Sequence, residues 1–227
     1  MDKLKTGIFA LALSIFMINV EAASFGGQDA TPTVYQVTLT KLEFQNSSGS
    51  WVTFAEGSHT FDIASVSANS AVGTIGQGST LPPDSYTNIR FTVSRTFGLS
   101  GSYTFGSTQR CITATSNAST GTLSGGTITN VGLGTVGASD PSTQSVPLPT
   151  GAAVTSALTG LGIAEVGGAG GALQITTPAV FTIPANAAVM PSVSIDFDVA
   201  NAIEFLETGS GTCDVMPQPP TITFSIN

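Results

Sequence analysis

The residues of this chain best suited to chemistry lie between Ser192 and Asp214, where acidic side chains gather. Five of the 14 acidic residues fall in this stretch: Asp196, Asp198, Glu204, Glu207 and Asp214. Paired carboxylates can serve as the acid and base of a glycosidase, and groups of carboxylates can bind calcium through their oxygens. The stretch therefore offers three interpretations: a catalytic pair, a calcium site, or the solvent-facing side of a strand.

Asp196 and Asp198 are the strongest metal candidates. Two residues apart on a predicted strand, they project from the same face about 7 Å apart. With Asn201 or Glu204 from the following turn they form a candidate calcium site, and calcium is the one cofactor that the sequence suggests. The residues that alternate with them are apolar: Ile195, Phe197 and Val199. On the alternative interpretation, those three face the core and both aspartates face water, where charge discourages edge pairing.

Residues for enzymatic catalysis are scarce. His59 is the single histidine, and no G-x-S-x-G elbow accompanies it. The Gly-rich run at 167–171 lacks the Lys-Ser/Thr ending of a phosphate loop. Trp51, the single tryptophan, is predicted to pack within a hairpin, which leaves no aromatic cleft for a glycosidase. The sequence predicts a protein that is not an enzyme.

The first 22 residues have the pattern of a secretory signal peptide. Lys3 and Lys5 precede an apolar run, and a small-x-small pattern ends at Ala22. A membrane anchor is the alternative, but the run is short for a membrane span. We expect a mature chain, residues 23–227, that is secreted to the periplasm, the cell surface or the medium without membrane insertion.

The charge of the chain excludes one class of partner. Its formal net charge is −8, with 6 basic and 14 acidic residues. A nucleic-acid surface needs clustered bases that displace counterions, and this chain has too few. Charged residues are 9% of the chain, against about 25% in an ordinary domain.

Cys111 and Cys213 are the only cysteines. In an exported protein, two cysteines predict one disulfide. Two buried free thiols or an intermolecular bridge are the alternatives.

Short strands with Gly and Pro turns dominate the rest of the chain. The segment 34–44 pairs with 51–54 as a predicted hairpin, and a shift of alternation at Thr40 and Lys41 predicts a bulge. Residues 59–63 form a further short strand, and 86–93 alternate as a half-buried strand. Strands also end the chain, and the pattern predicts an all-β, antiparallel, two-sheet β-sandwich in one domain.

Residues 98–177 differ in composition, being rich in Gly, Thr, Ser and Ala. We interpret them as an insertion of weak strands and loops between core strands at 34–93 and 179–226. The alternative is a disordered linker, but the Val, Ile and Leu content of the region is high for disorder. One short helix is predicted over Ala152 to Val166, where Val154, Leu158 and Leu161 have helical spacing.

Three segments carry a resemblance. They read YQVTLTKLEFQNSSGSWVTF, LPPDSYTNIRFTV, and FTIPANAAVMPSVSIDFDVANAI followed by PPTITF. Together they resemble a domain-of-unknown-function family of exported bacterial proteins. The resemblance implies a β-sandwich of the transthyretin or immunoglobulin-like kind, often a surface or lipoprotein module, and brings no catalytic residues. The chain lacks the lipobox that many members have.

Composition and missing catalytic groups together predict a non-enzymatic, secreted structural protein. It would act as a matrix, adhesion or filament component through self-association or a protein partner. The terminal strand Thr221–Ile226 and the segment Ala23–Thr33 are candidates for strand addition. The alternative is an extracellular ligand- or carbohydrate-binding module, assisted by calcium at Asp196 and Asp198.

Overall fold

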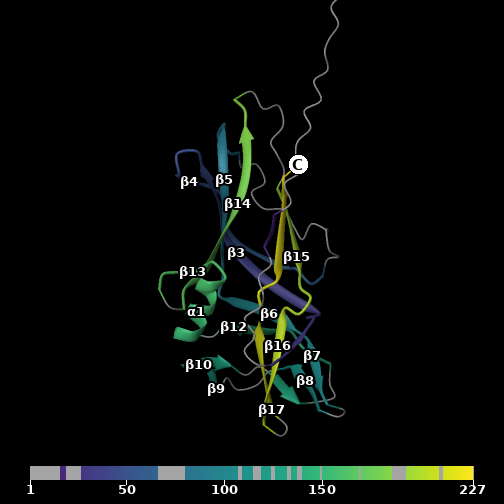
Figure 1. Cartoon of the computed structure of the whole chain (residues 1–227). Coiled ribbons are helices and arrows are strands. Elements are labelled where there is room, and N and C mark those ends of the chain that lie inside the picture. Colours follow the sequence, from purple (N-terminus) through teal and green to yellow (C-terminus); the bar gives the residue numbers. More distant parts are fainter. Residues whose placement is uncertain are drawn as a thin grey trace, which may run out of the picture.

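The longest strands form the hairpin that the sequence predicts. In the computed structural model (Figure 1), β3 (Val34–Asn46) pairs antiparallel with β4 (Trp51–Asp62). Their register shifts between Leu39 and Lys41, which confirms the predicted bulge. β4 continues across this shift, and Gly57 there has a positive φ of 136°, which glycine adopts without steric cost. The separate strand predicted over 59–63 is therefore the second half of β4.

The structure describes most of the chain. The described residues are 16–18, 27–65, 80–106, 109–114, 119–123, 126–131, 134–136, 140–148, 150–168, 170–185, 193–209 and 212–226. Among them the strands are antiparallel and a single helix occurs. None of these residues forms a helix long and apolar enough to cross a bilayer.

The main sheet has seven strands. Its order is β12 (Gln144–Pro147), β6 (Thr96–Ser100), β3, β5 (Asp84–Val93), β14 (Ala172–Ile183) and β13 (Ile163–Val166), with β4 also paired to β3. The predicted strand at 86–93 is β5, with Ile89, Phe91 and Val93 buried.

Residues 98–177, the predicted insertion, contribute β12, β13 and parts of β6 and β14 to this sheet. β6 pairs with β3 and β14 pairs with β5, while β12 pairs with β6 and β13 pairs with β14. Leu99, Val146 and Leu173 from this region are buried in the common core. The residues between these three are mostly small, so the composition of the region resembles that of a loop. A strand that packs against its neighbours needs few large side chains, and such a composition is therefore compatible with strands.

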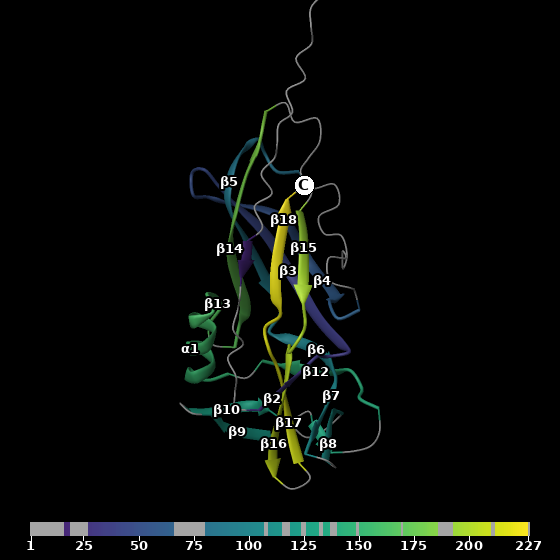
Figure 2. The ribbon, with the colours of Figure 1, turned by 45° about the vertical axis from the view of Figure 1, so that its right-hand side comes forward.

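A second layer faces the main sheet. It contains β15 (Val193–Asp198), β18 (Thr221–Ile226) and β1 (Phe16–Ile18), followed by β16 (Ile203–Gly209), β17 (Thr212–Pro217) and β2 (Gln28–Ala30). In Figures 1 and 2, β15 and β18 run beside the upper part of β3 and β14, and β16 and β17 continue toward the lower end. The arrangement is sandwich-like and all-β, as the sequence predicts.

Smaller units complete the lower end. They are β7 (Ser102–Phe105), β8 (Gln109–Thr113) and β11 (Gly134–Val136), the hairpin β9 (Ser119–Leu123) with β10 (Gly126–Val131), and α1 (Ala152–Gly160). The helix begins where predicted but ends at Gly160, because Gly162 has a positive φ of 71° and turns the chain into β13. Val154 and Leu158 are its buried residues.

The hydrophobic core contains residues of both layers and both cysteines of the disulfide. Phe44 makes edge-to-face contacts with Phe54, Tyr86 and Phe181. Cys111 of β8 and Cys213 of β17 form the predicted disulfide within the same cluster, with Cα atoms 6.1 Å apart. The bridge therefore ties the β7–β8–β11 sheet to the second layer.

Candidate functional site

The acidic stretch of the sequence does not form one site. Asp196 and Asp198 lie on β15, where Asp198 is exposed and its Oδ1 accepts a hydrogen bond from the Ala200 N–H at 2.9 Å. Glu204 is completely buried on β16, whereas Glu207 is exposed near the end of that strand. Among the described residues, no group of three or more His, Cys, Asp or Glu side chains is placed to hold a metal. The calcium prediction for Asp196 and Asp198 thus rests on their spacing alone.

Glu204 belongs to a buried polar network that the sequence did not indicate. Its Oε1 accepts a hydrogen bond from the Gly27 N–H at 2.5 Å, and its Oε2 accepts one from Gln218 Nε2. The Tyr35 hydroxyl donates to the Gln218 carbonyl at 2.8 Å. Burial raises the pKa of the Tyr35 phenol far above its usual value, so the group stays a donor. The network joins β3, the segment before β2, and β16.

This network corrects one part of the metal hypothesis. Glu204 was a candidate calcium ligand from a turn, yet it lies inside a strand and is bonded within the core. Gly27, its partner, lies close to the predicted signal-peptide cleavage point after Ala22. Glu204 therefore fixes the chain just before it enters β2.

The basic residues are engaged internally. Lys41 and Arg90 both form ion pairs with the buried Glu43, at 3.0 and 2.8 Å. The Arg90 guanidinium also lies 3.9 Å from the ring centroid of Trp51, a cation–π contact. The predicted position of Trp51 within the hairpin is confirmed, at the first residue of β4.

Arg95 is buried and forms an ion pair with Glu165 of β13. The carboxylate of Glu165 also accepts hydrogen bonds from Thr155 Oγ1 and the Gly170 N–H. The pKa of the Glu165 carboxyl lies below its usual value. The hydrogen bond from Thr155 is the main cause, and the Gly170 N–H and Arg95 act in the same direction. Arg110 donates to Ser102.

His59 is exposed on β4, where its ring stacks against Phe61 with centroids 6.5 Å apart.

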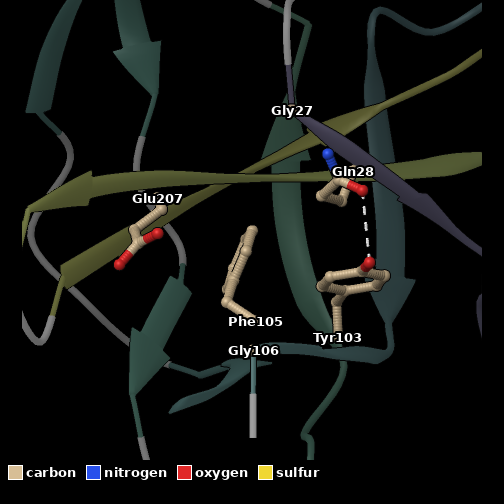
Figure 3. Close-up of a pocket in the computed structure, with 6 residues that line it drawn as sticks. All are labelled: Gly27, Gln28, Tyr103, Phe105, Gly106 and Glu207. Atoms are coloured by element: carbon tan, nitrogen blue, oxygen red, sulfur yellow. Dashed lines mark hydrogen bonds between the residues drawn. The ribbon is translucent and has the colours of Figure 1, made fainter.

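A pocket of about 340 Å³ lies where β2, β7 and β16 meet (Figure 3). Its lining residues are Gly27, Gln28, Tyr103, Phe105, Gly106 and Glu207. The rings of Tyr103 and Phe105 meet edge to face with centroids 5.0 Å apart. The Tyr103 hydroxyl donates to Gln28 Oε1 at 3.2 Å. Figure 3 shows the Phe105 ring standing between Tyr103 and the Glu207 carboxylate.

These pocket residues offer two kinds of contact. Half-buried aromatic rings bind the apolar face of a ligand, and the Glu207 carboxylate and Gln28 amide provide hydrogen-bonding groups at the rim. The residues come from positions near 28, 103 and 207, so no local motif could reveal them. Of the five acids in the stretch, Glu207 alone lines this pocket.

The edge of β18 is the second candidate site. β15 pairs with β18 over all of Thr221–Ile226. Among the described residues, the other edge is paired over Ile222–Phe224, by Phe16–Ile18 of β1. The strand that covers this edge therefore comes from the predicted signal peptide.

Comparisons of the chain with protein-family models, with curated proteins and with solved structures find no match. The resemblance to exported bacterial β-sandwich proteins stays a prediction from its three sequence segments.

Proposed function

We propose that the protein is exported, loses residues 1–22, and works outside the cytoplasm as a non-enzymatic structural protein that associates by β-strand addition. One observation carries this proposal: the outer edge of β18 is paired by Phe16–Ile18, which the sequence assigns to the cleaved leader. Cleavage would remove that strand. The backbone N–H and C=O groups of β18 would then be open to a strand from another chain.

The disulfide is in keeping with this location, because disulfides persist in oxidising compartments such as the periplasm and the medium. The non-enzymatic part of the proposal rests on the exposed single histidine and on the dispersal of the acidic residues to separate environments. A matrix or surface role depends on association between chains, which strand addition supplies, and a filament would need a further contact between the associated units.

The proposal predicts that processing switches on association. The protein should be expressed with its own leader, its N-terminus checked by mass spectrometry, and its mass measured by light scattering over a hundredfold range of concentration. We expect the processed chain to associate as concentration rises. The unprocessed chain, produced in an oxidising cytoplasm, should stay monomeric because β1 covers the edge. Two monomeric forms at every concentration would contradict the proposal.

A second candidate function is carbohydrate binding at the pocket of Figure 3. A pyranose ring has an apolar C–H face, suited to Phe105 and Tyr103, and hydroxyl groups, suited to Glu207 and Gln28. The pocket volume of about 340 Å³ is at the small end for ligand sites, which favours one or two sugar units.

Carbohydrate binding predicts that Phe105→Ala lowers the affinity for a neutral oligosaccharide about tenfold, because it removes an aromatic contact worth about 1–1.5 kcal/mol. Glu207→Gln should also lower it, since a charged acceptor binds hydroxyls more strongly than an amide. Calorimetry with a panel of neutral oligosaccharides measures both effects. Glu56→Gln is the matched control, an exposed glutamate on β4. Equal affinity in all variants, or no binding by any sugar of the panel, would rule out this site.

A further inference from the structure

We infer that the strand that takes the place of β1 is β18 of a second copy, paired antiparallel about a two-fold axis at Thr223. This inference rests on the proposed function, because it requires β1 to leave the edge. It adds the partner, the register and the symmetry of the assembly. The product is a dimer with a continuous sheet in the order β15, β18, β18 of the second copy, and β15 of the second copy.

The register follows from what β1 does. Phe16, Met17 and Ile18 lie opposite Phe224, Thr223 and Ile222. An antiparallel β18 centred on Thr223 would place its own Ile222, Thr223 and Phe224 at the same three positions. Large apolar residues then stand opposite Phe224 and Ile222, as they do in β1. The terminal strand is thus complementary to itself in the register that the structure already displays.

The faces also agree. Ile222 packs against the core, and positions 222 and 224 have the same phase in the alternation of the strand. In an antiparallel pair, directly opposite residues project from the same face of the sheet. Ile222 of the second copy, opposite position 224, would therefore lie on the core-facing side of the joined sheet. A register shifted by one residue would place polar Thr and Ser opposite the apolar positions.

Charge favours this edge over the edges of β15 and β4. Thr221–Ile226 contains no charged residue. Within the described part of the chain, β15 pairs on one side alone, and it carries Asp196 and Asp198. The edge strand β4 carries Glu56 and Asp62. Charged residues on an edge strand oppose pairing with another sheet. Because the β18 contact is the same patch on both copies, it closes after two chains.

Cysteine cross-linking tests the register. Thr223→Cys places two cysteines opposite each other at the axis, with Cα atoms about 4.5–5.5 Å apart, within the range of about 4.4–6.8 Å for a disulfide. The processed variant should form a disulfide-linked dimer under mild oxidation, and peptide mapping should find the 223–223 link. The same substitution in the chain that keeps residues 1–22 should remain unlinked.

Ser225→Cys is the matched control, on the same strand and of similar size. In the proposed register residue 225 faces residue 221, so two copies of residue 225 lie about 14 Å apart and cannot be bridged. A mixture of Ser225→Cys and Thr221→Cys chains should instead give the mixed dimer. Association without a 223–223 link would overturn the two-fold register while leaving the proposed function standing. Monomers throughout would overturn both.

Discussion

A variant with alanine at both Cys111 and Cys213 is expected to lose about 4–5 kcal/mol of its free energy of unfolding on the chain-entropy model. The disulfide links residues separated by 102 positions, so it removes many conformations from the unfolded chain. Both cysteines are buried, with exposed fractions of 0% and 3%. Alanine therefore removes packing in the core as well as the cross-link. Both contributions act in the same direction.

Urea unfolding followed by the fluorescence of Trp51 measures this loss. The midpoint should fall, and the denaturant dependence should steepen because an unlinked chain exposes more surface on unfolding. Reduced wild-type protein is the control, since it lacks the cross-link but keeps both side chains. It should unfold between the oxidised protein and the double variant. A variant that unfolds at the same urea concentration as the oxidised protein would show that the disulfide contributes no stability.

The hairpin of β3 and β4 was predictable because local signals agree there. Alternation marks both strands, and the turn places Gly49 at a φ of 84°, which glycine adopts without strain. The bulge at Thr40 and Lys41 was visible as a break in alternation. The disulfide was predictable because two cysteines in a chain predicted to be exported leave one intramolecular pairing.

The environment of Glu204 was not predictable in the same way. Alternation assigns neighbouring residues to opposite faces, one dry and one wet. Ile203, Glu204 and Phe205 are all fully buried, because β16 is covered on both faces. In a strand that is buried on both faces, alternation no longer predicts that a carboxylate lies at the surface. The expected acidic cluster therefore divides between the core, the pocket of Figure 3 and the exposed end of β15.

The pocket and the β18 edge escaped prediction for a topological reason. Gln28, Tyr103 and Glu207 come together because β2 pairs with β16 and contacts β7, pairings between segments far apart in the sequence. The sequence predicted a terminal strand at Thr221–Ile226, and the structure has β18 there, paired with β15. The second ladder, with Phe16–Ile18 of the predicted signal peptide, could not be read from composition or spacing.

Glu204→Ala is the second substitution with a large expected effect, about 3–5 kcal/mol of destabilisation. The alanine removes the acceptor of the Gly27 N–H and of Gln218 Nε2, both inside the core. Buried donors without acceptors lose the hydrogen bonds that water would provide in the unfolded chain. The free energy of unfolding, measured with urea, should fall accordingly. In this variant, the rate of amide hydrogen exchange should rise at Gln28–Ala30 relative to the wild type, and rise more than in β5, because Gly27 anchors β2.

Glu204→Gln separates the loss of hydrogen bonds from the loss of charge. The glutamine oxygen can still accept from Gly27, and its amide nitrogen would meet Gln218. Gln218 Oε1 has no hydrogen-bond partner in the described structure. Its amide can therefore turn over and accept from the new donor, so we expect a loss of about 1 kcal/mol.

Gly27→Ala tests the same contact from the other side. A Cβ at this position would lie 2.4 Å from the Phe205 carbonyl oxygen and 2.9 Å from Glu204 Cγ, so β2 would have to shift away from β16. The amide hydrogen exchange of β2 should be as fast in this variant as in Glu204→Ala, although the Glu204 carboxylate is still present. If Glu204→Ala and Glu204→Gln lower stability equally, the hydrogen bonds to Gly27 and Gln218 are not the source of the effect. If neither lowers it, Glu204 does not hold the start of β2.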